Sequence, residues 1–211
     1  MGAGVGRSSR GHEARLTPAG AADRDVVVSD DAIAIRRMRD DDYDYRLMVG
    51  WRNRAHVRRW WDPDEPPLDL ATAREEYRPD TLPDAASTAC FIERDGVPVG
   101  FIQFYRWSSY AEEAREVGVP FDEGTWGVDI FIGEESETGR GVGTRAMQLL
   151  GRHLHSAHGA SAVALTVDVD NDVAIRSYRK AGFERIKKVL DTDTRGGERV
   201  TAWLMVRRFE Q

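Results

Sequence analysis

The segment Gly139-Arg140-Gly141-Val142-Gly143-Thr144 lies between two apolar stretches with different character. Upstream, residues 125–133 form a short apolar run of the kind found in buried strands. Downstream, apolar residues recur at three- and four-residue steps from Val142 to Ala157, which predicts an amphipathic helix. We therefore expect a strand, a glycine turn and a long helix in this order.

The glycine turn predicts an anion site. Glycines allow successive backbone NH groups to point toward one position, and the N-terminus of the following helix adds about half a positive charge there. A pyrophosphate is a natural ligand for such a turn, and Arg140 offers a further charge-assisted bond. The continuous Gly-x-Gly-x-x-Gly of dinucleotide folds and the Gly-Lys-Ser/Thr of triphosphate loops are both absent from the turn. A plain glycine-rich connection remains the alternative.

The segments around this centre alternate between helix and strand patterns. Residues 1–31 lack an apolar period and are interpreted as a flexible leader, so that residues 32–211 form the folded domain. The predicted strands are 32–38, a hairpin of 89–94 and 97–107 around the turn pair Asp95-Gly96, 125–133, 162–167, 185–190 and 200–207. One or two helices are predicted between Asp40 and Trp60. Further helices are predicted over 69–77, in the segment after the glycine turn, and over 171–181. The fold class is α+β.

Composition restricts the class of partner. The chain has 211 residues with 41% hydrophobic content and a formal net charge of -6, which suits one core and argues against nucleic acid or an anionic membrane as partner. A cationic small molecule fits better. The single cysteine, Cys90, lies in an apolar run and is interpreted as a buried structural thiol in a cytoplasmic protein. No metal site is expected, because three histidines at 153, 155 and 158 would lie on different sides of a helix.

A second motif gives the glycine turn a specific meaning. Asn171-x-x-Ala174-x-x-x-Tyr178-x-x-Ala181-Gly182-Phe183 follows the turn after about thirty residues. The pair resembles the GNAT superfamily of N-acetyltransferases, which implies a single-domain fold with a central mixed sheet of six to seven strands flanked by helices. Thr138 stands where the family carries Arg or Gln, so the cradle would depend on backbone more than on side chains.

The resemblance implies acetyl-CoA as the acetyl donor. The last NH groups of the strand ending near Gly133 and the glycine turn would hold it, with Asn171 near the pantetheine arm. Tyr178 would lie near the CoA sulfur, where a phenol can donate a proton to the departing thiolate; a core aromatic is the alternative. The expected cofactor-binding residues are Ile132, Gly139, Arg140, Gly141, Val142, Gly143, Thr144, Asn171 and Tyr178.

The acceptor is expected to be an amine. Asp129 is a lone acid inside an apolar strand, which is costly unless a cation or hydrogen bonds accompany it. We interpret it as a base or amine anchor, the alternative being simple alternation that turns it to solvent. Acids concentrate between Glu112 and Glu135 and would attract a polycation, although a solvated loop explains the outer ones equally well. Trp60, Trp61 and Trp107 are candidate walls for sugar rings or, alternatively, core residues.

Four segments together look like the aminoglycoside 6′-N-acetyltransferases, over roughly residues 32–208. They are the Trp60-Trp61 pair and the sequences Gly-Val-Asp-Ile-Phe-Ile-Gly at 127–133, Gly-Arg-Gly-Val-Gly-Thr at 139–144 and Ala-Ile-Arg-Ser-Tyr-Arg-Lys-Ala-Gly-Phe at 174–183. This resemblance implies direct attack of the amine in a ternary complex, with Asp129 and Tyr178 as catalytic residues. A second drug-binding acid of the family has Asp168 as its nearest candidate, in a shifted position. The expected substrate-binding residues are Trp60, Trp61, Trp107, Glu112, Glu113, Asp129 and Asp168.

Two alternatives stay open. Siderophore-type acyltransferases that modify a lysine or hydroxylysine amine share the Trp-Trp and Asp-strand features, but a single amino acid would need less negative surface. A non-catalytic acyl-CoA-binding or drug-sequestering module would bind its ligand without releasing free CoA. The sequence is compatible with either a monomer or a homodimer.

Overall fold

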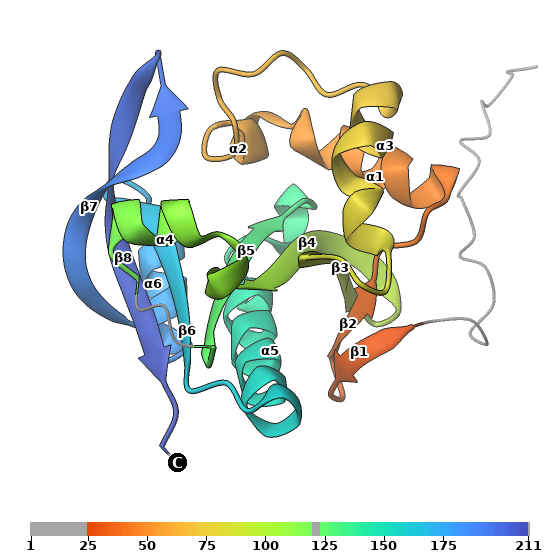
Figure 1. Cartoon of the computed structure of the whole chain (residues 1–211). Helices are drawn as coiled ribbons and strands as arrows, with labels where there is room; N and C mark the ends of the chain where they lie inside the picture. The colour runs from red at the N-terminus through yellow and green to blue at the C-terminus, as the bar shows by residue number, and fades with distance from the viewer. Residues whose placement is uncertain (1–24, 120–122, 211) are drawn as a thin grey trace, which may run out of the picture.

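The computed structural model describes residues 25–119 and 123–210. The strands in these residues form one eight-stranded sheet with the order β1-β2-β3-β4-β5-β6-β8-β7 (Figure 1). Neighbouring strands are antiparallel except for β5 and β6, which are parallel. The strands are β1 (Val26–Ser29), β2 (Ile33–Arg37), β3 (Ser87–Arg94), β4 (Val97–Arg106), β5 (Thr125–Ile132), β6 (Ala162–Asp168), β7 (Glu184–Arg195) and β8 (Glu198–Arg208).

Helices cover both faces of the sheet. The α-helices are α1 (Asp42–Arg52), α2 (Ala55–Arg58), α3 (Leu70–Tyr77), α4 (Ala111–Val117), α5 (Val142–His158) and α6 (Asp172–Lys180), with 3-10 turns at Pro79–Thr81, Trp107–Ser109 and Glu135–Glu137. Three of these helices begin at a side-chain cap, because Asp41, Asp69 and Asn171 each accept a backbone NH in the first turn. Helix α4 was not expected; it ends at Gly118, which has a φ of 70°.

Strand β1 corrects the predicted domain boundary at residue 32. Val26–Ser29 pairs antiparallel with β2, and the Asp30 carboxylate accepts NH groups from Ala32 and Ile33 in the turn between them. An edge strand of four residues is too short to show a period in sequence, and its pairing with β2 is what specifies it. With β1 included, the sheet has eight strands, whereas six or seven were expected. Residues 1–24 of the predicted leader lie outside the described residues.

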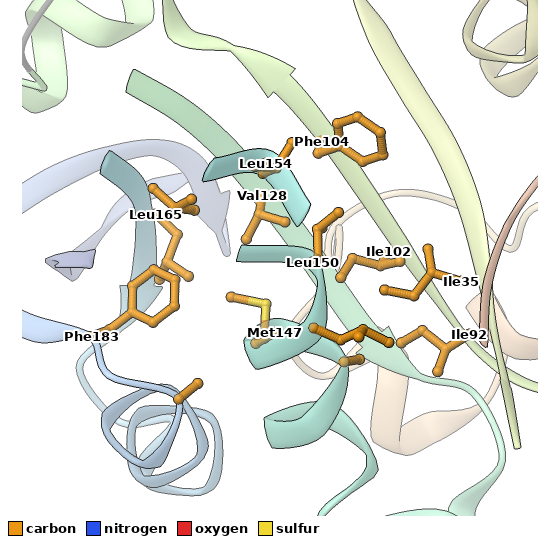
Figure 2. Close-up of a cluster of buried hydrophobic side chains, with 14 of the residues drawn as sticks. Ile35, Ile92, Ile102, Phe104, Val128, Met147, Leu150, Leu154, Leu165 and Phe183 are labelled. Carbon is orange, nitrogen blue, oxygen red and sulfur yellow. The ribbon is translucent and has the colours of Figure 1, made fainter. Parts of the chain in front are cut away.

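The core has a layer on each face of the sheet. On one face, α5 packs against side chains that include Ile35, Ile92, Ile102 and Val128 (Figure 2). On the other face, α1 and α3 pack through Tyr45, Met48, Trp51 and Tyr77 against Phe91 and Phe101. Successive strand residues point to opposite faces, so the apolar run 89–92 in β3 serves both layers and all four of its residues are buried. Burial raises the pKa of the Cys90 thiol to about 12, in keeping with its predicted structural role.

Two turns follow the predictions made from glycine. Asp95 and Gly96 connect β3 to β4 with φ values of 51° and 76°, as a two-residue hairpin loop requires. Gly182 ends α6 with a φ of 94°. Within residues 25–119 and 123–210, none of the helices has the length and apolar character needed to cross a bilayer.

The sheet opens between β5 and β6. Their parallel ladder joins Thr125–Gly127 to residues 162–164, and no further pair follows among the described residues. The two strands therefore separate toward their carboxyl ends, while β5 stays paired with β4 as far as Ile132. The N-termini of α5 and α6 follow β5 and β6 in the chain, so both helices begin at this opening.

Candidate functional site

A cleft of about 1300 Å³ occupies the opening between β5 and β6. Its walls come from the glycine turn, the ends of β5 and β6, helix α6, the segment after α2 and the β7–β8 hairpin. All cofactor-binding residues predicted from sequence line it: Ile132, Gly139, Arg140, Gly141, Val142, Gly143, Thr144, Asn171 and Tyr178. Predicted residues that lie far apart in sequence, such as Ile132 and Tyr178, thus meet in one cleft.

The glycine turn has the geometry of an open cradle. Gly139 and Gly141 have φ values of 77° and 83°, and a Cβ added to either would meet nothing within 4 Å. Gly141 is the N-cap of the 17-residue helix α5 and has no side chain with which to cap it. The first NH groups of a helix have no partner within the helix, so those of Val142, Gly143 and Thr144 are available to a ligand in the cleft. The turn therefore fits a pyrophosphate, as predicted.

Helix α6 is fixed against this cradle by its own polar residues. The Asn171 side chain accepts the NH of Ala174 over 3.1 Å, which sets the start of the helix. The hydroxyls of Thr144 and Ser177 lie 2.8 Å apart and join α5 to α6. Asn171 is thus an N-cap as well as a cleft residue, and Thr144 positions the neighbouring helix.

The end of β5 corrects one detail of the expected cofactor contacts. The NH groups of Gly133 and Glu134 both donate to the Val99 carbonyl, over 2.9 and 3.0 Å, so neither is available to a ligand. Amide directions alternate along a strand, which turns the NH of Ile132 away from β4 and toward the opening. The expected backbone contact is therefore restricted to Ile132, whose side chain also lies beside Gly143.

Asp129 faces the cleft in the company of polar side chains from β4 and α6. Gln103, its cross-strand partner, donates from Nε2 to the Asp129 carboxylate over 2.7 Å. Burial, and next the negative charge of Asp129, raise the pKa of the Tyr178 phenol. The same two causes, in the same order, raise the pKa of Tyr105 well above its usual value. Both phenols therefore keep their protons at neutral pH. Both also lie near enough to the Asp129 carboxylate for its charge to raise their pKa.

The three predicted tryptophans divide between wall and core. Trp60 lines the cleft and lies within 5.2 Å of the Arg195 guanidinium carbon. Trp61 also lines it but packs edge-on against Phe101 and Phe131. Trp107 is 5% exposed and its indole NH donates to the Ala164 carbonyl, so it supports the wall mainly from within the core.

The predicted acids also divide. Glu113 and Asp168 line the cleft, whereas Glu112 is exposed on α4 and does not belong to the described lining. A helix turns about 100° per residue, so adjacent positions of α4 point in different directions. Sequence proximity had grouped Glu112 with Glu113. Asp168 is ion-paired with Arg195 over 2.8 Å.

Charge is unevenly distributed along the cleft. Four cations line the part of the cleft formed by the glycine turn, α5 and α6, namely Arg140, Arg145, Arg176 and Lys180, and the acid Glu137 lies beside Arg140. Acids line the other walls, on α3, α4, β5, β6, β7 and the loop after α2: Asp62, Glu76, Glu113, Asp129, Asp168 and Asp191. The first group suits a phosphate-bearing ligand and the second a cationic one. The described residues contain no cluster of metal-ligating side chains, which agrees with the expectation of no metal site without testing it.

Several lining residues were missed from sequence. Gln103 and Tyr105 alternate along β4 and are followed two residues later by Trp107, just after the strand, and this period of two was a usable signal for their shared face. Asp62 lies in the loop after α2, Glu76 on α3, and Asp191 and Arg195 both on β7, and their sequence pattern carried no such signal.

This fold, with a glycine cradle at a helix N-terminus beside a split in a mixed sheet, defines an acyltransferase class. Residues 40–190 match the family model "Acetyltransferase (GNAT) domain", and the chain belongs to this family.

Its relatives include aminoglycoside N(6′)-acetyltransferases type 1 of Klebsiella pneumoniae and Serratia marcescens. Each is 30% identical over 172 residues, which cover 80% of this chain and 82% of the relative. Among solved structures, AAC(6′)-Ib in complex with paromomycin and acetyl-CoA superposes with a TM-score of 0.69 at 27% identity, covering 84% of this chain and 94% of the other. AAC(6′)-Ib with coenzyme A and kanamycin gives 0.67 at 27% identity, covering 83% and 94%. The predicted family resemblance is confirmed.

Proposed function

We propose that the protein is an aminoglycoside 6′-N-acetyltransferase that transfers the acetyl group of acetyl-CoA to a primary amine by direct attack in a ternary complex. The observation that carries this proposal is the division of one cleft into a cationic end at the glycine turn and an acidic end around Asp129. The relatives that share the fold act on aminoglycosides by name.

The donor end fits acetyl-CoA. The positive φ values of Gly139 and Gly141 leave the cradle open, and the first NH groups of α5 would hold the pyrophosphate. Arg140, Arg145, Arg176 and Lys180 supply cations for its phosphates, and the NH of Ile132 is directed toward the pantetheine path. When bound, acetyl-CoA supplies an acetyl group activated as a thioester. The groups that bind the donor and move protons come from the backbone and side chains of the protein.

The acceptor end can bind and deprotonate an amine. A primary ammonium is mostly protonated at pH 7 and must lose its proton before it attacks a carbonyl carbon. The Asp129 carboxylate, held by Gln103, attracts the ammonium and accepts its proton. As the new C–N bond forms and the C–S bond breaks, the Tyr178 hydroxyl would protonate the departing sulfur, and the proton that the nitrogen loses on becoming an amide would restore the phenol. Its raised pKa keeps that proton available.

The acidic wall favours an acceptor with several positive charges. Asp129, Asp168, Asp191 and Glu113 lie on four different elements around the same cleft. A single lysine or hydroxylysine amine would use one of these acids, whereas an aminoglycoside presents several ammonium groups on a rigid frame. This difference supports the aminoglycoside over the siderophore-type acceptor.

A thiol-release assay tests the proposal. Acetyl-CoA is supplied with kanamycin, with an analogue that lacks the 6′-amine, and with lysine and hydroxylysine derivatives. We expect free CoA with kanamycin and none with the analogue. Turnover of the lysine derivatives alone would establish the siderophore-type alternative, and tight binding of acetyl-CoA and kanamycin without thiol release would establish the non-catalytic module.

A further inference from the structure

The β7–β8 hairpin reaches across the acidic end of the cleft to the segment that follows α2. Figure 1 shows the hairpin tip and α2 on the same side of the molecule. The NH groups of Gly196 and Gly197 donate to the two carboxylate oxygens of Asp64, over 2.8 and 3.1 Å. We call this connection, made of Arg195, Gly196, Gly197 and Asp64, the strap.

The sequence of the turn explains the strap. Gly196 and Gly197 have φ values of 63° and 77°, and Arg195 pairs with Glu198 across them, so they form the two-residue loop of a hairpin. Consecutive residues in this conformation direct adjacent NH groups toward one side, where a single carboxylate can accept both. The strap therefore fixes the position of Arg195, the residue that immediately precedes the loop.

Arg195 brings a positive charge to the acidic end of the cleft. Its guanidinium lies 2.8 Å from the Asp168 carboxylate, and its central carbon is 5.2 Å from the centre of the Trp60 ring. The Arg195 side chain is 40% exposed and that of Asp168 is 13% exposed, so the ion pair is partly shielded from water. A cation held between a carboxylate and an indole face has the surroundings that an ammonium group of a substrate would seek.

We propose that Arg195 is a specificity-determining residue that competes with the acceptor for Asp168. In the free protein its guanidinium satisfies this carboxylate, and an acceptor with a second ammonium group has to displace it to reach Asp168. An acceptor with one ammonium group, bound at Asp129, has no such need. The inference rests on the proposed function, because it concerns how the same cleft receives an amine.

The competition predicts an effect that depends on the charge of the ligand. Removing Arg195 frees Asp168 and removes a repulsive charge, so binding of a polycation becomes tighter. The gain is about fivefold in affinity, the order expected for losing a partly exposed ion pair. A ligand with one ammonium group gains much less, because it has no charge to place at Asp168.

The experiment compares Arg195→Ala with the unaltered protein by calorimetric titration, in the absence of acetyl-CoA. The probes are kanamycin, which is a polycation, and 6-amino-6-deoxyglucose, which carries a single ammonium group. Arg185→Ala is the matched control, because it removes another arginine from β7. The Arg185 guanidinium carbon lies 5.1 Å from the centre of the Trp203 ring, and its side chain does not belong to the described lining of the cleft. Thermal unfolding of each variant shows that it is folded.

We expect Arg195→Ala to bind kanamycin about fivefold more tightly and Arg185→Ala to bind it as the unaltered protein does. In an Asp168→Asn background, Arg195→Ala should change the affinity by less than about twofold, because the competition no longer exists. Unchanged or weaker kanamycin binding by Arg195→Ala would overturn the inference, and so would an equal gain for both probes. If kanamycin binds but is not acetylated, the proposed function fails while this comparison still decides the role of Arg195; if kanamycin binds neither protein, both fail.

Discussion

Gln103 donates a hydrogen bond from Nε2 to the carboxylate of Asp129 over 2.7 Å, directly across the β4–β5 ladder. The pairing explains how an acid is tolerated within an apolar strand. A partly buried carboxylate needs hydrogen bonds or a cation, and Gln103 provides one such bond. It also fixes the direction in which Asp129 faces the cleft.

Asp129→Asn is expected to lower kcat/KM for kanamycin by about 100-fold or more, because an amide cannot accept the proton of the ammonium group. The measurement is the initial rate of thiol release at saturating acetyl-CoA. Glu184→Gln serves as control, since it neutralises an exposed acid at the start of β7 outside the described lining. Full activity of Asp129→Asn with unchanged kanamycin affinity would show that the role assigned to Asp129 is wrong.

Tyr178→Phe tests the proton donor. The ring packs near Phe183, with 6.1 Å between the ring centres, and phenylalanine keeps this contact. We expect kcat to fall by about tenfold to 100-fold while the KM for acetyl-CoA changes little, because the loss is confined to proton transfer. Stopped assays of CoA release give both constants, and an unchanged kcat would assign Tyr178 to the core alone.

The raised pKa of Tyr178 also predicts the alkaline behaviour of the enzyme. A phenol whose folded-state pKa lies above its usual value of 10 stays protonated through that pH, so its proton remains available for transfer. Its contribution to stability is complete below pH 10 and is lost only as the pH rises through the raised value. Absorbance titration of the phenolate in the unaltered protein and in Tyr178→Phe should therefore differ only above pH 10.

The glycine turn offers a matched pair of alanine substitutions. Gly141→Ala is expected to cost about 1–2 kcal/mol in the free energy of unfolding, because its φ of 83° is unfavourable for a residue with a Cβ. Gly143→Ala should be neutral or stabilising by up to about 1 kcal/mol, because its Cβ would meet Ser177 at an ordinary 3.7 Å. Both should raise the KM for acetyl-CoA by narrowing the approach to the helix NH groups. Urea unfolding and steady-state kinetics separate the two effects, and equal stabilities would contradict the left-handed assignment of Gly141.

A buried ion network beneath α1 should dominate stability. Arg36 donates to Asp44 and Glu93, over 2.7 Å and 2.9 Å, and all three side chains are almost fully buried. Arg36→Met is expected to lower the free energy of unfolding by about 3–5 kcal/mol, because it removes the cation that the two buried carboxylates share, while Asp44 keeps its contacts with Arg39. Arg37→Met, at the next residue, removes only an exposed pair with Asp25 and should cost at most about 1 kcal/mol. Similar midpoints in urea for the two variants would contradict this account.

Local patterns predicted the elements whose signal is contained within one segment. Helix α5 was predictable from its apolar stripe, α6 from its spacing before Gly182, and the β3–β4 hairpin from Asp95-Gly96. Strand β1, with four residues, and helix α4, with seven, were not predicted, because each is too short to show a clear apolar period in sequence. The glycine turn at the start of α5 was predictable for the same reason that α5 was: its glycines and its helix are adjacent in sequence.

By itself, the sequence determined the α+β class, the glycine cradle at the start of α5, the Asp129 strand and the Tyr178 helix, because each depends on backbone preferences and spacing within a single segment. Only the tertiary structure decided that Gln103 supports Asp129, that Glu113 reaches the cleft while Glu112 does not, and that Arg195 lies on Asp168. These relationships join residues up to dozens of positions apart. The energy of each of these contacts depends on the distance between side chains on different elements. Those distances are set by how the strands and helices pack together and by the strap.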